Sequence, residues 1–583
     1  MSLRNADANA DPTSPGAWSV AGTVDELRSA GRLLTKVGRL PVVVVENEGA
    51  LYAIEDRCPH LGFPLHQGTV EAGMITCHWH HARFDLASGC TLDPWADDAV
   101  GFEAQAVDGQ VQVRSRTVGP SVERLRARLR DGLEHGITLV MAKAILGLLD
   151  AGVEPDEIVA EAARFGLVNR ADGWSSGLTT LVALANLVPL LDEPDRALAL
   201  VHGVAEVARS TAGRAPRFPE RPLDEAGVRP ARLAEWYRRF VETRTADAAE
   251  RALATLVDAD RNAAEATMFA AVTDHVFVDE GHALDFTNKA AEIAALVDTE
   301  LAGLALTSLV AQTCAGDRAE ESSEWQHPVD LVAMLRDATP KLLAAHAAAP
   351  GGSGTLDAAA LAATIVDGEP EVVLAAILAA AETGATAEEL GRAVAHAAAL
   401  RLVRFPTRND VGDWNTVHHT FTSAHALHQS LARQPTPELL RAVPQLALRI
   451  HLDRFLNVPA ARRPTEGEAT FDELAACWDR QGEVDRTGVL TYRLARRPGG
   501  TRAVIAAVGH ALLQEDAGFH AYQIVEAGAR HALSWPEGSE EGALTLAGVA
   551  RFLAAHTPTR RERVQIVRTA QLLRRGEPLY TDG

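Results

Sequence analysis

The sequence predicts an α+β multidomain protein in which a small all-β domain is followed by a large all-α domain with internal duplication. Three observations predict this class. The chain has 583 residues, which exceeds what one hydrophobic core usually serves. Residues 17–115 are rich in Val, Gly and short alternating runs. From about residue 122, apolar residues recur at i, i+3, i+4 and i+7, the spacing of amphipathic helices.

The β domain contains a hairpin pattern. The run LPVVVVENEGALYAIED predicts two strands joined by a turn at Asn47-Glu48-Gly49, because Gly tolerates the backbone that a tight hairpin needs. We expect residues 1–16 to be a disordered N-terminus and residues 17–115 to form the β domain.

The helical part is predicted to consist of two similar halves, 120–346 and 355–583, separated by the Gly/Ser-containing segment AAAPGGSGT at 347–355. The run ILGLLDAGVEPDEI from Ile145 recurs as ILAAAETGATAEEL from Ile377. Three more anchors follow in the same order: Trp174 with Trp414, His202 with His451, and His275 and His282 with His510 and His520. We therefore expect a duplication packed about a pseudo-two-fold axis.

Composition excludes several classes of partner. The formal net charge of -22 disfavours binding to nucleic acid or to anionic membranes. The N-terminus lacks the apolar core of a signal peptide, and no run of about 18 apolar residues offers a membrane span. Five cysteines are too few for a disulfide framework. We expect a cytoplasmic protein; the sequence does not indicate its oligomeric state.

Two short segments supply two thiolates and two imidazoles. Cys58-Pro59-His60 precedes Cys77-His78-Trp79-His80, so that each segment gives one Cys and one His. Two loops of this kind can place both sulfurs on one iron and both imidazoles on the other iron of a [2Fe-2S] cluster. A tetrahedral Cys2His2 zinc site uses the same ligand types, but zinc fingers group the two Cys together and the two His together.

The segments CPHLGFPLHQG and GMITCHWHHARFDLASG resemble the two cluster loops of Rieske proteins of the ferredoxin and oxygenase type. This resemblance implies a Rieske domain over residues 17–115, with Cys58, His60, Cys77 and His80 holding a [2Fe-2S] cluster. His81 stands where many Rieske proteins have Gly, and Ala82 where they often have Trp. No Cys follows Leu61-Gly62, unlike the respiratory-complex type, which carries an extra loop disulfide.

The helical part suggests a second metal ion. His275, Asp279 and His282 would share one face of a continuous helix at i, i+4 and i+7, and two His with a carboxylate can bind Fe or another non-haem metal. The matching segment offers His510, Glu515 and His520 at looser spacing. Histidines on apolar helix faces are also common as hydrogen-bonded core residues, so both interpretations stay open.

The catalytic residues are not determined by the sequence; His202, His419 and His451 are candidates for substrate or acid–base roles. The segment WNTVHHTFTSAHALHQSL and the later RIHLDRFL resemble questin-oxidase-like proteins, helical enzymes linked to Baeyer-Villiger-type oxidation. This resemblance implies kinship of fold; it does not carry the chemistry over.

These patterns favour an oxidoreductase. A Rieske-type electron-transfer domain would feed electrons to a helical domain that oxidises or oxygenates a small organic substrate. No dinucleotide-binding Gly motif is present, so an external reductase or ferredoxin would be the donor. The alternative is a non-catalytic redox-sensing or docking protein, with the cluster on a helical scaffold.

Overall fold

The structure of the protein, a computed structural model, describes residues 17–38, 40–115, 121–223, 227–349, 356–575 and 577. The segment expected to be disordered, 1–16, lies outside the described residues, as do 350–355 of the expected linker and 578–583. The chain divides into two compact units. Unit 1 is Met1–Glu154 with Val564–Gly583, and unit 2 is Pro155–Arg563.

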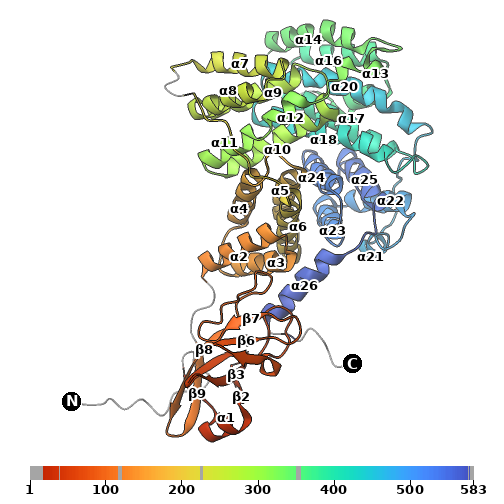
Figure 1. Cartoon of the computed structure of the whole chain (residues 1–583). Helices are drawn as coiled ribbons and strands as arrows, with labels where there is room; N and C mark the ends of the chain where they lie inside the picture. Colours follow the sequence, from red (N-terminus) through yellow and green to blue (C-terminus); the bar gives the residue numbers. More distant parts are fainter. Residues whose placement is uncertain are drawn as a thin grey trace. The chain divides into compact units, whose positions relative to one another are not determined.

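Unit 1 begins as a small β-rich domain (Figure 1). Its strands are β1 Ser19–Thr23, β2 Arg32–Val37, β3 Leu40–Asn47, β4 Ala50–Glu55, β5 Thr69–Glu71, β6 Met74–Thr76, β7 Arg83–Asp85, β8 Gly101–Val107 and β9 Gln110–Ser115. They form a six-stranded sheet in the order β1-β9-β8-β4-β3-β2 and a three-stranded sheet β5-β6-β7. The expected hairpin is confirmed, because β3 and β4 pair antiparallel around Glu48 and Gly49, both with positive φ.

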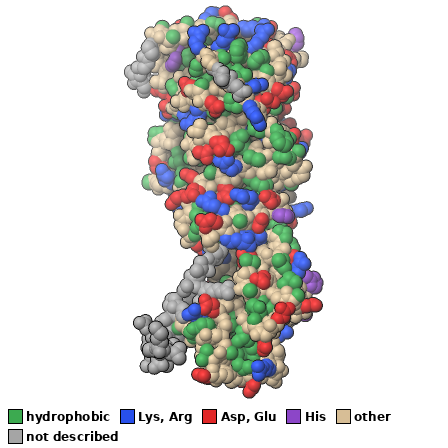
Figure 2. Space-filling model, turned by 60° about the vertical axis from the view of Figure 1, so that its left-hand side comes forward, with side chains coloured by type: hydrophobic (Ala, Val, Ile, Leu, Met, Phe, Trp, Pro, Cys, Tyr) green, Lys and Arg blue, Asp and Glu red, His purple; other side chains and the backbone are tan. Residues whose placement is uncertain are grey.

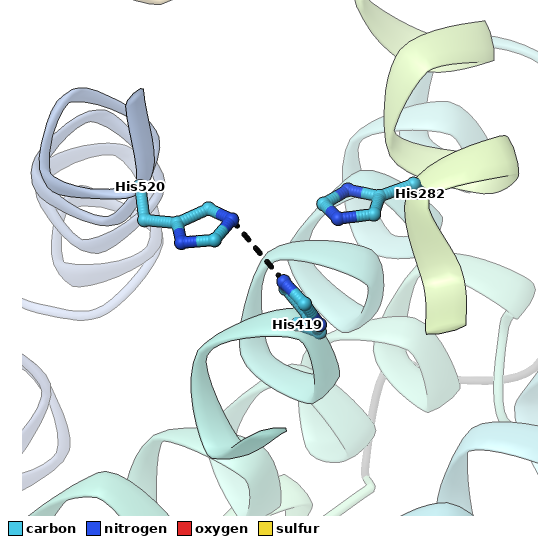
Figure 3. A group of neighbouring side chains, drawn as sticks. All are labelled: His282, His419 and His520. Carbon is cyan, nitrogen blue, oxygen red and sulfur yellow. Dashed lines mark hydrogen bonds between the residues drawn. The ribbon is translucent and has the colours of Figure 1, made fainter. Parts of the chain in front are cut away.

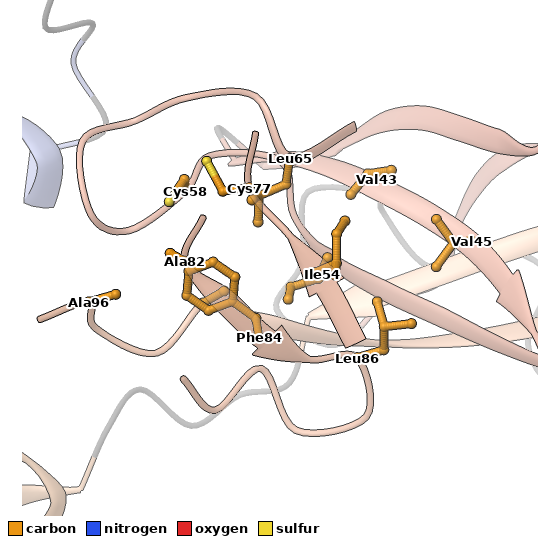
Figure 4. Close-up of a cluster of buried hydrophobic side chains, with 12 residues drawn as sticks. Val43, Val45, Ile54, Cys58, Leu65, Cys77, Ala82, Phe84, Leu86 and Ala96 are labelled. Atoms are coloured by element: carbon orange, nitrogen blue, oxygen red, sulfur yellow. The ribbon is translucent and has the colours of Figure 1, made fainter. Parts of the chain in front are cut away.

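The larger sheet separates two apolar clusters because its side chains alternate between faces. Val42 and Val44 contribute to a cluster with the short helix α1 (Val24–Ala30), whereas Val43 and Val45 face the smaller sheet. Figure 4 shows this second cluster, with Cys58 and Cys77 among its buried side chains.

The helical segment after residue 120 begins inside unit 1. Helices α2 (Val122–His135) and α3 (Thr138–Asp150), which we expected in the first helical half, belong to the unit of the β domain. Arg128 explains the association, because its guanidinium donates to the carbonyls of Pro94 and Ala96 at 2.9 and 2.5 Å. The last helix, α26 (Glu562–Arg575), returns to the same unit, where Arg574 pairs with Asp150 on α3.

Unit 2 is helical throughout its described residues, so the predicted order of a small β-rich domain and a large helical region is confirmed. Its longer helices are α4 Pro155–Val168, α5 Ser176–Leu187, α6 Glu193–Thr211, α7 Pro230–Glu242, α8 Ala246–Ala259, α9 Arg261–Thr273, α10 His282–Leu296, α11 Thr299–Thr307, α14 Leu331–Ala348, α15 Ala358–Asp367, α16 Pro370–Glu382, α17 Ala387–Arg404, α18 Asp413–Arg433, α20 Ala442–Leu452, α22 Val484–Ala495, α23 Gly500–Leu513, α24 Phe519–Leu533 and α25 Glu540–Ala555. Its short helices are α12 Val310–Ala315, α13 Ser323–Gln326, α19 Pro437–Leu440, α21 Phe471–Ala475 and the 3-10 turns η2 Val188–Leu190, η3 Val278–Gly281, η4 Ala319–Glu321 and η5 Asp453–Asn457. The 3-10 turn η1 Leu65–Gln67 lies in unit 1.

Helices matched by the expected duplication pack reciprocally in unit 2. By sequence, α5 corresponds to α18 and α10 to α24; in the structure α10 packs against α18, and α24 packs against α5. An exchange of partners of this kind is what a pseudo-two-fold axis produces. The duplication itself remains a proposal, which this packing supports.

None of the helices that the structure describes is long and apolar enough to cross a membrane. Figure 2 shows acidic and basic side chains interspersed on the face that it presents.

Candidate functional site

Two loops of unit 1 bring the predicted cysteines and histidines together. The first loop follows β4 and carries Cys58 and His60, and the second joins β6 to β7 and carries Cys77 and His80. The side chains of Cys58 and Cys77 are close enough to influence each other's pKa, and both cysteines are buried. The rings of His60 and His80 have centroids 4.8 Å apart. We call the segments 58–62 and 77–81 the cluster loops.

The two cluster loops have the same backbone geometry. In the first loop the Cys58 N–H donates to the Phe63 carbonyl at 2.7 Å, and the Gly62 N–H donates to the Cys58 carbonyl at 2.7 Å. In the second loop the Cys77 N–H donates to the Ala82 carbonyl, and the His81 N–H donates to the Cys77 carbonyl. His81 therefore occupies the position of Gly62, and both have positive φ, 64° and 82°. A Gly at this position avoids the steric cost that a side chain adds.

Polar groups around the loops fit an iron–sulfur cluster. Backbone N–H groups of His60 and Leu61 donate to the Cys58 sulfur, and those of Trp79 and His80 donate to the Cys77 sulfur. Such bonds stabilise the negative charge of cluster sulfur. His60 Nδ1 is buried and has no hydrogen-bond partner, so a nitrogen lone pair is available there. Burial, followed by the charges of His80 and Lys143, lowers the pKa of His60 to about 4, which keeps this imidazole neutral.

Lys143 on α3 holds the first cluster loop. Its ammonium donates to the carbonyl oxygens of Pro59 and His60, the latter at 3.3 Å, and pairs with Asp97 at 2.9 Å. The side chain is only 10% exposed, so these contacts are largely shielded from water. The sequence pattern did not indicate this residue, because nothing in a lone Lys on a helix marks its tertiary partner.

The helical unit places three histidines around one point, and we call His282, His419 and His520 the histidine triad (Figure 3). They come from the start of α10, from α18 and from the start of α24. One ring nitrogen of each lies within 4.8 Å of the others. The Nε2 atoms of His419 and His520 face each other at 3.2 Å. Phe286 stacks on His282 at 5.0 Å, so part of the surrounding wall is apolar.

Neighbouring groups set the tautomers of two triad histidines. His419 Nδ1 lies 3.0 Å from the Glu280 carboxylate, and His520 Nδ1 lies 3.0 Å from the Asn415 side-chain oxygen. Both partners accept, so each Nδ1 carries the hydrogen and each Nε2 presents a lone pair. Burial, together with the neighbouring histidines, lowers the pKa of His419 to about 3 and that of His520 to about 4. Two bare nitrogens therefore face each other without a proton between them.

The predicted metal set on one helix face is wrong. The chain does not continue as a helix between His275 and His282, because Phe277, Asp279 and Glu280 have φ of 42°, 51° and 52° and break the i, i+4, i+7 register. His275 instead lies between Glu320 and Glu242, with nitrogen–oxygen distances of 2.7 and 3.0 Å.

The matching set His510, Glu515 and His520 also does not converge. His510 pairs with Asp195 at 2.9 Å, and Glu515 accepts from Thr559 and Arg561. Only His520 of this set belongs to the triad. Two residues that sequence reasoning did not place there, Glu280 and Asn415, orient the triad. Glu280 contacts His419 and Asn415 contacts His520, more than a hundred residues away in each case, so no local spacing indicated them.

The three catalytic candidates have different surroundings. His202 is fully buried and its Nδ1 lies 2.8 Å from the Tyr522 hydroxyl, whereas His451 Nδ1 donates to the Gly368 carbonyl at 3.2 Å. His202 and His451 thus have different hydrogen-bond partners, and their roles as catalytic candidates stay predictions. Among the three, His419 alone lies in the triad.

A second group of buried histidines lies on α17, α18 and α24. The ring centroid of His531 lies 6.0 Å from that of His396 and 5.8 Å from that of His428. His425 is 1% exposed and neither of its ring nitrogens has a hydrogen-bond partner. Burial lowers the pKa of all four side chains, so the core of unit 2 holds them as neutral imidazoles.

The comparisons with known proteins agree on unit 1. A model of the Rieske [2Fe-2S] domain matches residues 17–103. The chain is 30% identical over 83 residues to ferredoxin CarAc of Metapseudomonas resinovorans, covering 14% of this chain and 78% of the ferredoxin. It is 33% identical over 84 residues to aminopyrrolnitrin oxygenase PrnD of Pseudomonas fluorescens, covering 14% and 23%.

A longer match, 27% identical over 165 residues, is to human apoptosis-inducing factor 3. It covers 28% of this chain and 25% of that protein, so the chain spans about a quarter of this relative. The helical remainder is not identified by these matches. Residues 17–103 form a Rieske [2Fe-2S] domain, and through this domain the chain belongs to the Rieske proteins.

Proposed function

We propose that this chain is an oxidoreductase in which the Rieske domain feeds electrons to a non-haem metal ion at the histidine triad, where a small organic substrate is oxidised or oxygenated. Cys58, His60, Cys77 and His80 would hold the [2Fe-2S] cluster, and an external reductase or ferredoxin would reduce it. The similarity to a ferredoxin and to an oxygenase supports a role in electron transfer associated with oxygenation.

The observation that carries the proposal is the pair of facing nitrogens in the triad. His419 Nε2 and His520 Nε2 both present lone pairs at 3.2 Å, which is repulsive unless a cation lies beside them. Metal–imidazole bonds of ~2.1 Å place neighbouring nitrogens of a tetrahedral site ~3.4 Å apart, close to this separation. One ring nitrogen of each triad histidine lies within 4.8 Å of the others. A small rotation of one ring would bring the most distant of these nitrogens to the separation of a metal site.

The surroundings of the triad fit a metal ion better than a buried hydrogen-bond network. A carboxylate on the outer nitrogen of a ligating histidine is the usual support of such a ligand, and Glu280 occupies that place on His419. Imidazole ligands suit Fe, Zn and Cu, and three protein ligands leave positions open for substrate or dioxygen. A redox-active ion is required if electrons are to be used there, so we propose iron.

The protein's own groups would perform the remaining tasks. The cluster, when bound, supplies one-electron transfer at a potential raised by its two neutral imidazoles. Backbone N–H groups of the cluster loops stabilise the sulfur charge, and Lys143 holds the first loop in place. In unit 2, the carboxylate of Glu280 and the amide of Asn415 orient two triad imidazoles, and Phe286 stacks on the third.

The alternative of a redox-sensing scaffold has less support. Buried imidazoles of unit 2 outside the triad include His451, which bonds to a carbonyl, and His425, which has no bonded nitrogen. In the triad the imidazoles turn their free nitrogens toward one another instead.

Metal content of the holoprotein tests the proposal. We expect about three irons per chain in protein assembled with iron, two in the cluster and one at the triad. His419→Ala is expected to reduce the content to about two while leaving the visible spectrum of the cluster unchanged. His510→Ala is the matched control, because this imidazole also has a carboxylate partner but lies outside the triad. Equal iron content in all three proteins, with no other metal present, would refute the triad site.

A further inference from the structure

Lysine is rare in this chain, and one of its lysines lies against a cluster loop. The lysines of the sequence are Lys36, Lys143, Lys289 and Lys341, and arginine supplies all the other permanently basic side chains. Lys36 and Lys341 are exposed. Lys143 comes from α3, which follows the β domain in the chain, and its ammonium donates to the carbonyl oxygens of Pro59 and His60.

This contact places a positive charge at the first cluster loop. A lysine ammonium has three N–H donors and is protonated at neutral pH. Lys143 lies against three oxygens, the two loop carbonyls and the carboxylate of Asp97 at 2.9 Å. The side chain is only 10% exposed, so water and salt screen its charge less than they screen a charge on the surface.

The two cluster loops differ in their exposure to solvent. Residues 58–62 of the first loop are buried or half-buried, and the ring of Trp95 packs against that of His60 with centroids 4.9 Å apart. In the second loop, residues 78–81 are exposed. Lys143 therefore contacts the loop that is more sheltered from solvent.

The charges around Lys143 form a small group within unit 1. Asp97 pairs with Lys143 and lies 3.5 Å from Arg128, which also pairs with Asp131 at 2.7 Å. The group thus contains two cations and two carboxylates. Lys143 contacts the cluster loop directly, whereas Asp97 contacts Lys143, so the positive charge is the one in contact with the loop.

We propose that Lys143 raises the reduction potential of the Rieske cluster and that Asp97 offsets part of this effect. The inference rests on the cluster assigned in the proposed function and is independent of the histidine triad. An oxidised cluster with two thiolates and two neutral imidazoles is neutral, and one electron from the external donor gives it a single negative charge. A cation in contact with its loop stabilises the reduced form more than the oxidised form.

In this chain, the potential then depends on a helix outside the β domain. The backbone N–H groups that donate to the Cys58 and Cys77 sulfurs belong to the cluster loops themselves. Lys143 is instead supplied by α3. Through it, the cluster accepts electrons from weaker donors than the β domain alone would allow.

A redox titration of the full chain with its cluster assembled tests this inference. We expect Lys143→Met to shift the equilibrium constant for reduction at least tenfold toward the oxidised cluster, which is ~59 mV for one electron. Asp97→Asn should shift it at least threefold in the opposite direction. Lys36→Met is the matched control, because it removes a lysine charge from an exposed position of the same unit, and it should change the constant less than twofold.

Salt gives a second comparison. The shift caused by Lys143→Met should persist in about 1 M salt, since the charge is sheltered from solvent. A change of less than twofold in Lys143→Met would overturn the inference. So would a shift of Asp97→Asn toward the oxidised cluster, because loosening of the loop contacts moves both variants in the same direction. If Lys143→Met does not retain the cluster, the direction of the Asp97→Asn shift decides.

The wild-type protein separates the two possible failures. If it lacks the visible and electron paramagnetic resonance spectra of a Rieske cluster, the ligands assigned in the proposed function are wrong. If it has these spectra and Lys143→Met keeps both them and the wild-type potential, the ligands stand and only the role of Lys143 is refuted.

Discussion

Acidification should unfold the helical unit abruptly, because its core holds neutral histidines. Outside the triad, six buried imidazoles have strongly lowered pKa values: His202 at about 3, His396 and His428 at about 4, and His418, His425 and His531 well below the ordinary value. The unfolded chain titrates at ~6.5. Below that pH the unfolded state binds protons that the folded state does not, so stability falls as pH falls.

The magnitude follows from the number of imidazoles. Above pH ~6.5 a buried imidazole does not change the free energy of unfolding with pH. Below that pH each imidazole lowers the free energy of unfolding by ~1.4 kcal/mol per pH unit, until the pH reaches its own folded pKa. At pH 5.5 six such groups together remove ~8 kcal/mol, which is comparable to the ~5–15 kcal/mol that stabilises a typical domain. We therefore expect the midpoint of acid unfolding to lie at about pH 5 to 5.5, with a slope of ~8 kcal/mol per pH unit.

Far-ultraviolet circular dichroism combined with urea unfolding at a series of pH values measures this slope. His425→Leu supplies the comparison, because the imidazole is fully buried, neither ring nitrogen is bonded, and leucine does not titrate. The variant should lower the slope by ~1.4 kcal/mol per pH unit and move the midpoint to lower pH. Helical signal that persists unchanged to pH 4, or an equal slope in the variant, would refute the reasoning.

Three other changes test the local geometry. Glu280→Gln should weaken Co(II) binding at the triad about tenfold, since a hydrogen bond to a largely exposed charged acceptor contributes ~1.5 kcal/mol. Calorimetry measures this binding. Glu242→Gln, which removes a carboxylate from the unrelated His275, should leave it unchanged. Gly281→Ala should lower the free energy of unfolding, measured with urea, by ~2–4 kcal/mol. The reason is that Gly281 has a φ of 94° and a Cβ would lie 2.8 Å from the Ser423 hydroxyl. A decrease below ~1 kcal/mol would contradict this reasoning. His81→Gly should stabilise unit 1 by ~0.5–1 kcal/mol, seen as slower thermal loss of the visible cluster spectrum, and faster loss would argue against strain at φ 64°.

Local patterns were sufficient for the Rieske domain. Each cluster loop carries its Cys and His within three or four residues, and a turn of that length brings them together wherever the loop is placed. The β-strand alternation and the turn at Glu48-Gly49 are likewise properties of neighbouring residues. For this reason the sequence alone predicted the domain, its fold class and the residues proposed as ligands.

The helical site depended on information that no local pattern contains. The expected face of His275, Asp279 and His282 assumed an unbroken helix, but the turn at Phe277 to Gly281 places His275 with Glu320 and His282 at the start of α10. An Asp-Glu-Gly segment is compatible with a continuous helix and with a turn. The close packing of Gly281 against Ser423 on α18 favours the turn.

The sequence by itself determined that the chain has a Rieske domain followed by a histidine-rich helical region, because those features reside in adjacent residues and in periodicity. Only the tertiary structure decided which histidines meet. His282, His419 and His520 are more than a hundred residues apart in sequence, and they converge because three helices pack around them. Helix packing sums many weak contacts between distant segments, so the composition of the triad could not be read from the spacing within any one of them.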